Sequence, residues 1–407
     1  MTDAVARASV TRVGVATVMS ALCGYAVLYL AARNLDPAGF SVFAVFWGAF
    51  GLVGGAAYGL LQEATREVRA ARTAEPDDGP HAHPMRLATG VGVAAAAVIA
   101  GSSPLWSTHV FAESVGLSVI LLSAGLAGFC LHATLLGMLA GVGRWTEYGA
   151  LMVADAGMRV VIAVATFLAG WGVVGYLWAT VGGALAWLLL LFVSPATRAA
   201  ARLSTPGGTG AFLRGASHSI AAAGASAILV MGFPVLLKTA AGDLGAEGGV
   251  VILAVTLTRA PLLVPLTAMQ GNLIAHFVDH RGHRLKALLP PAAAILGLGV
   301  AGVVASARLG PWLLRVVFGS DYVASAALLA WLTAGAVSVA LLTLTGAATV
   351  AAALHRAYSV GWVTATIASA LLLTLPLELP TRTIIALSCG PVVGIAVHLG
   401  ALARHSH

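Results

Sequence analysis

The sequence predicts an all-α polytopic membrane protein with about twelve transmembrane helices. Hydrophobic residues make up 59% of its 407 positions and charged residues 9%, against about 45–50% and about 25% in soluble proteins. The chain also contains repeated apolar runs of about 20 residues, the length that an α-helix needs to cross a bilayer. With 48 glycines, close helix packing is favoured over the alternating pattern of a β-barrel. A soluble fold is excluded on these grounds.

Twelve such runs are bounded by charge, glycine or proline. They lie near residues 11–31, 40–61, 87–106, 114–140, 150–169, 172–193, 216–237, 249–274, 288–307, 325–350, 358–376 and 383–402. A shift of 207 residues places Pro104 on Pro311 and Phe111 on Phe318. This weak repeat predicts two six-helix lobes related by a pseudo-twofold axis along the membrane normal.

The predicted lobes comprise residues 1–194 and 216–407. Residues 195–215, rich in Ser, Thr, Pro and Gly, form the expected cytoplasmic linker between them. The hydrophilic stretch from Gln62 to Arg86 is expected to be a solvated, partly disordered loop. Between the spans, Lys and Arg number fifteen on one side against five on the other, so both termini are predicted to be cytoplasmic.

Ionisable residues inside spans are costly and are the first candidates for function. Asp155 and Arg159 stand four residues apart in the fifth span, on one helix face and within pairing reach. In one interpretation they form an intrahelical ion pair that lowers the cost of insertion. In the other, Arg159 meets a phosphate in a central cavity and Asp155 fixes or releases it.

The eighth span carries Arg259 followed by Pro261 and Pro265. Each proline removes a backbone donor, so a kinked or discontinuous helix is expected. Broken helices line substrate sites in transporters, and an unpaired cation beside one suits an anion; alternatively, Arg259 snorkels or pairs with a carbonyl of another helix. Gln270 and Asn272, later in this span, are candidates for binding sugar hydroxyls or for satisfying freed backbone groups.

A polar stripe on the first span is a further binding candidate. Tyr25, Tyr29 and Arg33 recur at intervals of four residues, and Lys238 ends the seventh span at the corresponding place in the second half. Anchoring at the membrane interface explains the tyrosines equally well.

Enzymatic motifs are absent from the sequence: there is no nucleophile elbow, Walker loop or zincin motif. We therefore expect no enzyme and no cofactor. His276, His280 and His283 match no closed metal site, so no metal is predicted. His132 and His398 are lone histidines in apolar spans, interpreted either as hydrogen-bonded fillers or as proton relays.

Three segments resemble the polysaccharide flippases of the multidrug, oligosaccharidyl-lipid and polysaccharide (MOP) exporter superfamily. They are Ala31–Ala44 (AARNLDPAGFSVFA), Thr258–Leu262 (TRAPL) and Gly310–Tyr322 (GPWLLRVVFGSDY). The resemblance implies movement of a lipid-linked oligosaccharide across the bacterial cytoplasmic (inner) membrane, with a polyprenyl-pyrophosphate headgroup held in the central cavity. Arg159 and Arg259 best fit that role. The first span lacks the acid typical of cation-coupled drug exporters, which makes drug extrusion less favoured.

The resulting hypothesis is a multi-pass membrane flippase that works by alternating access in cell-envelope polysaccharide biosynthesis. Its expected partners are the lipid-linked oligosaccharide, the lipid bilayer, and glycosyltransferases or a polymerase of the same pathway, with no nucleic acid. Two alternatives stay open. One is cation-coupled small-molecule or drug efflux through Asp155, and the other is a non-transporting membrane subunit of a polysaccharide assembly complex.

Overall fold

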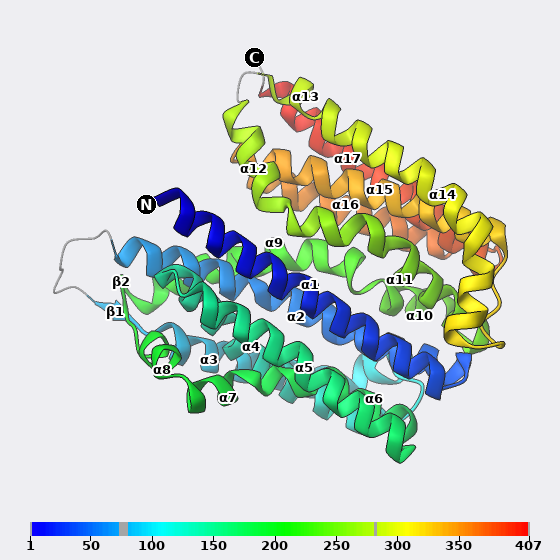
Figure 1. Ribbon diagram of the computed structural model, residues 1–407, viewed down its shortest axis with the longest axis horizontal. Coiled ribbons are helices and arrows are strands. Elements are labelled where there is room, and N and C mark those ends of the chain that lie inside the picture. The colour runs from blue at the N-terminus through cyan, green and yellow to red at the C-terminus, as the bar shows by residue number, and fades with distance from the viewer. Residues whose placement is uncertain (1, 73–79, 281–282, 406–407) are drawn as a thin grey trace. The chain divides into compact units, whose positions relative to one another are not determined.

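A computed structural model describes the backbone of residues 2–72, 80–280 and 283–405. Helices account for almost all of it, and two two-residue strands form the one sheet in these ranges (Figure 1). Ten helices of the described chain are long and apolar enough to cross a membrane, and one bent helix pair adds an eleventh. The protein is therefore a multi-pass helical membrane protein, and the predicted fold class is confirmed.

The twelve predicted runs all fall on helices. The run at 172–193 is divided over α6, a short 3₁₀ turn η1 and α7, and the run at 216–237 is the bent pair α9 and α10. The run at 358–376 coincides with α16 (His355–Leu373), which is not among the ten long apolar helices. Its first turn carries His355 and Arg356, so its 19 residues are less apolar than those of the other spans.

The chain divides into two compact units. Unit 1 contains residues 1–34 and 46–227, and unit 2 contains residues 35–45 and 228–407. Helix α2 (Pro37–Ala71) starts in unit 2 and continues in unit 1, whereas α9 (Thr209–Val230) lies in unit 1 up to Ala227. The sequence-based boundary at 195–215 thus precedes the observed one by most of α9.

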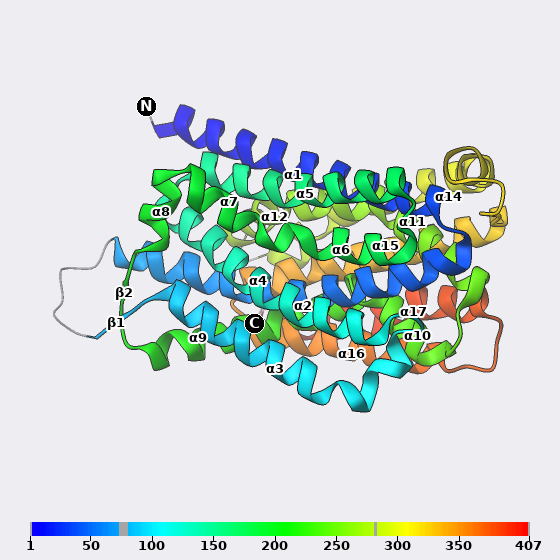
Figure 2. The same ribbon diagram turned by 90° about the horizontal axis from the view of Figure 1, so that it is seen from below.

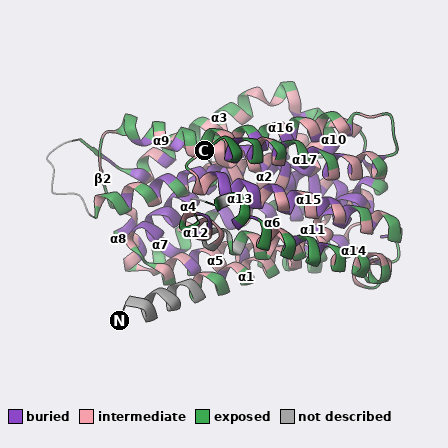
Figure 3. Cartoon of the chain, turned by 90° about the horizontal axis from the view of Figure 1, so that it is seen from above, coloured by how far each residue is buried: buried purple, intermediate pink, exposed green. Residues whose placement is uncertain are grey.

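Unit 1 contains the helices of the first six predicted spans. Besides α2 and α9, its elements are α1 (Thr2–Asn34), α3 (Pro84–Val110), α4 (Val115–Val142), α5 (Trp145–Ala169), α6 (Gly172–Gly182), η1 (Gly183–Leu185), α7 (Ala186–Val193) and α8 (Pro195–Ala201). Much of α2 and α4 is buried, whereas few residues of α1 and α3 are buried (Figure 3). The first pair therefore forms the centre of the unit, where Leu135 and Leu139 pack against Leu151 of α5.

Two loops of unit 1 meet in a short antiparallel ladder. Strand β1 (His81–Ala82) pairs with β2 (Thr205–Pro206), and the two lie side by side in Figures 1 and 2. The expectation of a loop from Gln62 onward was wrong, because α2 remains helical to Ala71 and buries Glu63 at 2% exposure. The predicted linker likewise holds α8, β2 and the start of α9.

Glycines allow α9 to approach α2 closely within unit 1. A Cβ at Gly59 would overlap the backbone of Ile220, and a Cβ at Gly215 would overlap the carboxylate of Glu63. Such contact distances are available only to residues without a side chain. The burial of Glu63 follows from this approach; its carboxylate also pairs with Arg66 at 2.6 Å.

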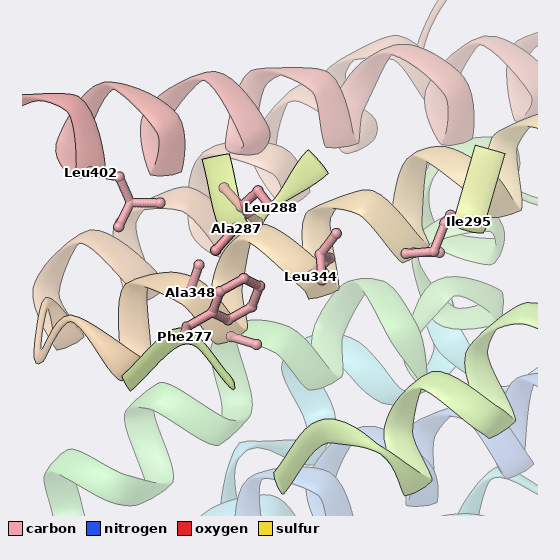
Figure 4. Packing of buried hydrophobic residues seen from close by; sticks show 9 residues of the cluster. Phe277, Ala287, Leu288, Ile295, Leu344, Ala348 and Leu402 are labelled. Atoms are coloured by element: carbon pink, nitrogen blue, oxygen red, sulfur yellow. The ribbon is translucent and has the colours of Figure 1, made fainter. Parts of the chain in front are cut away.

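Unit 2 contains the remaining spans. Its elements are α10 (Phe233–Ala241), α11 (Gly245–Ala268), α12 (Gln270–Asp279), α13 (Arg284–Ala287), α14 (Leu289–Phe318), α15 (Ala326–Ala351), α16 and α17 (Leu379–Arg404). A buried cluster connects five of these helices, α12, α13, α14, α15 and α17 (Figure 4). In it, Phe277 of α12 lies beside Leu344 and Ala348 of α15, with Leu288 and Leu402 completing the group. Van der Waals packing of this kind holds membrane helices together.

Two of the segments on which the family resemblance rests meet in unit 2. The Tyr322 hydroxyl donates to the carbonyl of Leu35 at 3.3 Å, and its ring packs edge-on against Phe40 at 5.9 Å between centroids. Burial, followed by the nearby Asp36 and Asp321 carboxylates, raises the pKa of Tyr322. Residues 35–45 belong to unit 2 through these contacts, although the rest of α2 belongs to unit 1.

Candidate functional site

Asp155 and Arg159 form an ion pair on α5. Arg159 Nη2 lies 2.9 Å from Asp155 Oδ1 and Nε lies 3.3 Å from the same oxygen. Arg159 Nη1 donates to the carbonyl of Thr180 at 2.7 Å, near the end of α6. The two side chains are 13% and 18% exposed. The guanidinium is thus shared between a carboxylate of its own helix and a carbonyl of a neighbouring one.

The ion pair lies against an interruption of the sixth span. Helix α6 ends at Gly182 and gives way to η1, whose first residue is Gly183. A Cβ at Gly183 would overlap Asp155 Oδ1 and Arg159 Nε, so only glycine permits this approach. The rings of Trp47 and Phe50 lie 5.9 Å and 5.3 Å from Arg159 Cζ. These contacts fit a guanidinium well.

This geometry matches the intrahelical ion pair that the spacing of the two residues suggested. The Asp155 charge is neutralised at short range, and several Arg159 nitrogens already have partners. Binding of a phosphate by Arg159, with Asp155 as its switch, stays a prediction. It would require the pair to open.

Arg259 of α11 is the buried cation of unit 2. It is 7% exposed, and its Nη1 faces the carbonyls of Leu229 and Val230 at 3.5 Å and 3.4 Å. The ring of Phe233 lies 4.9 Å from Cζ. Its Nε and Nη2 are buried and have no hydrogen-bond partner among the described residues. This differs from Arg159, whose charge is paired with a carboxylate.

The position of Arg259 follows from a break in the seventh span. Helix α9 ends at Val230 and α10 begins at Phe233, with a bend of 62° between them. The last carbonyls of α9 lack intrahelical partners and carry the negative end of its dipole, so a cation there is stabilised. The Nε and Nη2 nitrogens of Arg259 take no part in this stabilisation. Each buried donor without an acceptor lowers the stability of the fold by about 1–3 kcal/mol.

Capping of another helix's last carbonyls is a recurring role of arginine in this fold. Arg72 donates to Val142 at the end of α4, Arg198 to Leu191 and Phe192 near the end of α7, and Arg382 to Leu373 at the end of α16. Arg159 and Arg259 follow the same pattern at the ends of α6 and α9. Capping alone therefore explains part of each arginine's placement.

The eighth predicted span is interrupted at Met269 and not at Pro261 or Pro265. Helix α11 continues through both prolines to Ala268, and the chain turns at Met269 before α12. One missing donor is tolerated where the flanking hydrogen bonds hold the helix. The side chains of Gln270 and Asn272, in the first turn of α12, lie outside the described residues.

The exposure of the polar residues on α1 increases toward the end of the helix. Tyr25 is half-buried, Tyr29 is 41% exposed and Arg33 is exposed in the last turn of the helix. Lys238 is half-buried in α10 of unit 2. Tyr25, Tyr29 and Arg33 belong to unit 1 and Lys238 to unit 2, and the roles of these four residues in binding stay predictions.

Sequence reasoning missed Thr180, Gly183 and Phe233, which complete the surroundings of the two arginines. A weak signal was present for two of them. Gly183 follows Gly182, a pair that interrupts helices, and Phe233 stands between Gly232 and Pro234, a typical start for a new helix. The role of the Thr180 carbonyl leaves no trace in the sequence.

Relatives with similar sequences come from mycobacteria. The uncharacterized protein Rv3630 of Mycobacterium tuberculosis H37Rv is 70% identical over 402 residues, covering 98% of this chain and 93% of the relative. The uncharacterized protein Rv1510 of the same strain is 64% identical over 403 residues, covering 99% and 93%. The chain belongs to the family of these proteins. No family model matches the sequence.

Solved structures give the fold. An inward-facing multidrug resistance MATE family transporter of the MOP superfamily is similar with a TM-score of 0.69 at 18% identity, over 95% of each chain. A MOP superfamily transporter from Pyrococcus furiosus, described as having a binding pocket of reverse polarity, gives 0.66 at 17% identity over 98% of this chain and 96% of that one. The chain therefore has the fold of MOP superfamily transporters. Membership of the polysaccharide flippase branch stays a prediction.

Proposed function

We propose that this protein is a MOP-fold transporter that flips a polyprenyl-pyrophosphate-linked oligosaccharide, or a related anionic cell-envelope glycan intermediate, across the bacterial cytoplasmic membrane by alternating access. The fold supports transport, and the choice of an anionic substrate rests on one observation. Two buried nitrogens of Arg259, Nε and Nη2, have no hydrogen-bond partner in the part of the chain that the structure describes, and charge-assisted hydrogen bonds to phosphate oxygens would supply partners for them.

The balance of charge inside the spans favours an anion over a cation. The carboxylate of Asp155 is neutralised by Arg159, and the carboxylate of Glu63 by Arg66. Arg259 has no carboxylate within ion-pair distance among the described residues. An uncompensated charge in a membrane span marks a substrate pathway more often than a purely structural position.

The test is flipping of a fluorescent lipid-linked oligosaccharide in proteoliposomes by the wild type and by Arg259→Gln. Two lost charge-assisted hydrogen bonds at about 1.5–3 kcal/mol each predict a decrease of at least about a hundredfold. Arg382→Gln is the control, because Arg382 also caps a helix end but is only half-buried, and one of its nitrogens (Nε) lacks a partner among the described residues against two in Arg259. It is expected to lower stability without a comparable loss of flipping.

Unchanged flipping by Arg259→Gln, or by Arg159→Ala combined with Arg259→Ala, would remove the proposed anion site. An equal loss in the Arg259 and Arg382 variants would assign both arginines to helix capping alone. Purified wild type that flips nothing, yet co-purifies in fixed ratio with a glycosyltransferase, would favour a non-transporting subunit of an assembly complex.

Cation-coupled efflux of small molecules is a second candidate, supported by the fold likeness to a multidrug resistance transporter. In that case Asp155 would exchange its arginine partner for a proton or a metal cation during the cycle. The decisive measurement is drug sensitivity of a deletion strain complemented with the wild type or with Asp155→Asn. Rescue by the wild type and loss of rescue by the variant would support efflux.

A further inference from the structure

The last part of α14 changes direction near a proline. Helix α14 is continuous from Leu289 to Phe318, and Pro311 lies inside it. In Figure 1 the yellow end of α14 runs across the direction of α15 and α17 of the same unit, and in Figure 2 it is seen end-on. A proline inside a helix removes a backbone hydrogen bond and kinks the helix. We call residues Pro311–Phe318 the elbow segment.

Contacts on both sides of the proline hold the bend. Before it, the hydroxyls of Ser306 and of Thr333 on α15 lie 2.9 Å apart, so this part of α14 follows α15. Beyond the proline, Leu314 is 3% exposed, and the ring of Phe318 lies 6.4 Å from that of Tyr322 between centroids. One side of the elbow segment therefore packs against unit 2.

The other side of the elbow segment is an exposed apolar face. Trp312, Leu313 and Val316 are 59%, 43% and 58% exposed. These three residues lie within about 100° of the helix circumference, because neighbouring residues are about 100° apart. Arg315 is exposed beside this face, and the buried Leu314 lies on the opposite side. The segment thus has one face for the protein and a second apolar face, with a cation at its edge.

Lipid is the partner that fits the apolar face. In the spanning part of α14, Leu298, Val300, Val304 and Leu309 are 54–68% exposed, so the lipid-facing surface of the span continues into the elbow segment. A helical segment that runs across the spans, with an exposed tryptophan on an apolar face, is typical of the membrane interface. The apolar face then meets hydrocarbon and is kept from water.

Two exposed arginines lie on either side of the bend. Arg308 and Arg315 are exposed, and neither takes part in an ion pair among the described residues. The acid closest to Arg315 in sequence, Asp321, is exposed and accepts from the Ser320 hydroxyl at 3.3 Å. An arginine at the edge of an apolar face extends its guanidinium to the headgroup level, where phosphate oxygens bind it with charge-assisted hydrogen bonds.

We propose that the elbow segment is a lipid-binding site in the membrane interface, with its apolar face at the hydrocarbon boundary and with Arg308 and Arg315 on the phosphates of anionic phospholipids. Both arginines belong to the five basic residues on the predicted outer side. The site does not depend on the proposed transport function, and its tests need no transported substrate.

The first test measures the depth of the elbow segment in lipid nanodiscs. Single spin labels are attached after Trp312→Cys or Val316→Cys, in a background with Cys23→Ala, Cys130→Ala and Cys389→Ala. Depth follows from the accessibility of each label to oxygen and to a nickel chelate. We expect both labels at the same depth, about 5–10 Å into the boundary between headgroups and acyl chains.

The matched control pair lies in the spanning part of the same helix. Val300→Cys and Val304→Cys are also four residues apart, which is about 6 Å along a helix, so their labels should differ in depth by about that amount. A difference as large between positions 312 and 316 would show a continuing span and overturn the proposal. Labels exposed to water at both positions would do the same. Leu313→Cys replaces Trp312→Cys if that variant fails to fold.

The second test measures anionic lipid around the elbow segment. A bimane label at Val316→Cys is quenched by brominated phosphatidylglycerol mixed with phosphatidylcholine, and then by the inverse mixture. One basic residue near the surface enriches anionic lipid about fivefold. We expect phosphatidylglycerol to be the more effective quencher and Arg315→Gln to lower its local enrichment about fivefold. Arg404→Gln is the control, because Arg404 is an exposed arginine in the last turn of α17 in the same unit; it should leave the enrichment unchanged.

Equal quenching by the two lipids, or an enrichment that survives Arg315→Gln, would remove the headgroup site. Inorganic phosphate is compared with chloride at equal ionic strength to separate a lipid from a free anion. We expect both salts to act alike. A loss of enrichment caused by phosphate alone would assign Arg315 to free phosphate and overturn the lipid site.

Discussion

Replacing Gly183 with alanine tests the arrangement of the ion pair against the interrupted span. The backbone of Gly183 has φ −61° and ψ −27°, values that any L-residue adopts, so the substitution acts only through the added methyl group. That methyl would overlap Asp155 Oδ1, the Asp155 carbonyl and Arg159 Nε. Either η1 moves away from α5, or the ion pair moves away from η1.

The expected cost follows from these two responses. Overpacking a buried site costs about 1–3 kcal/mol, and losing the hydrogen bond from Arg159 to Thr180 costs about 1.5–3 kcal/mol because its donor is charged. The two costs are alternatives, because either the site stays overpacked or the structure relaxes and the hydrogen bond from Arg159 to Thr180 is lost. Alanine gains about 0.5–1 kcal/mol over glycine in helical backbone. The net destabilisation is therefore about 1–2 kcal/mol.

Gly157→Ala provides a control on the same helix as the ion pair. A Cβ at Gly157 meets no atom within 4 Å, so this variant is expected to gain stability by up to about 1 kcal/mol. Both are measured by reversible unfolding in mixed detergent micelles, followed by tryptophan fluorescence. Gly183→Ala as stable as Gly157→Ala would refute the close approach of η1 to the Asp155–Arg159 pair.

Two further predictions concern the segment of α2 that belongs to unit 2. Tyr322→Phe removes the hydrogen bond to the Leu35 carbonyl and should cost about 0.5–1.5 kcal/mol in the same unfolding assay. Because the pKa of Tyr322 is raised in the folded state, its contribution is present below the unfolded pKa of about 10 and is lost as the pH rises above it. The variant should lose less stability in alkali than the wild type, and parallel pH curves would contradict this. Gly249→Ala would place a Cβ on the Pro37 carbonyl; about 1–3 kcal/mol of destabilisation is expected, and cross-linking of cysteines placed at the start of α2 and α11 should fall. An unchanged cross-linking yield would show that the two helix starts are not in contact.

The helices could be predicted from the sequence because their signals are local. Each apolar run contains enough residues to span a bilayer, and backbone groups in lipid must be satisfied within the helix. The pair of Asp155 and Arg159 was predictable for the same reason, since a spacing of four residues places both side chains on one helix face. The prolines at 261 and 265 predicted a kinked or discontinuous eighth span. The span is interrupted at Met269, after both prolines, because a missing donor weakens a helix without specifying where it ends.

The surroundings of the candidate residues depend on long-range packing. Arg259 meets carbonyls 29 and 30 residues away, and the interruption of the sixth span depends on the approach of Gly183 to α5. The length of α2 was mispredicted because the polar residues after Gln62 predict a solvent-exposed loop. In the structure α9 covers Glu63, so this polar segment remains helical and partly buried.

The sequence by itself determined that this chain is a bundle of membrane helices, and that Asp155, Arg159 and Arg259 lie inside apolar runs. It did so because helix formation in lipid is decided within each apolar run. Only the tertiary structure decided that Arg159 is neutralised by its neighbour whereas two buried nitrogens of Arg259 have no partner among the described residues, and that the ring nitrogens of His398 face the Thr345 hydroxyl and the Tyr358 carbonyl. Partners of a buried polar group come from helices distant in the sequence, and their approach is set by the packing of small residues.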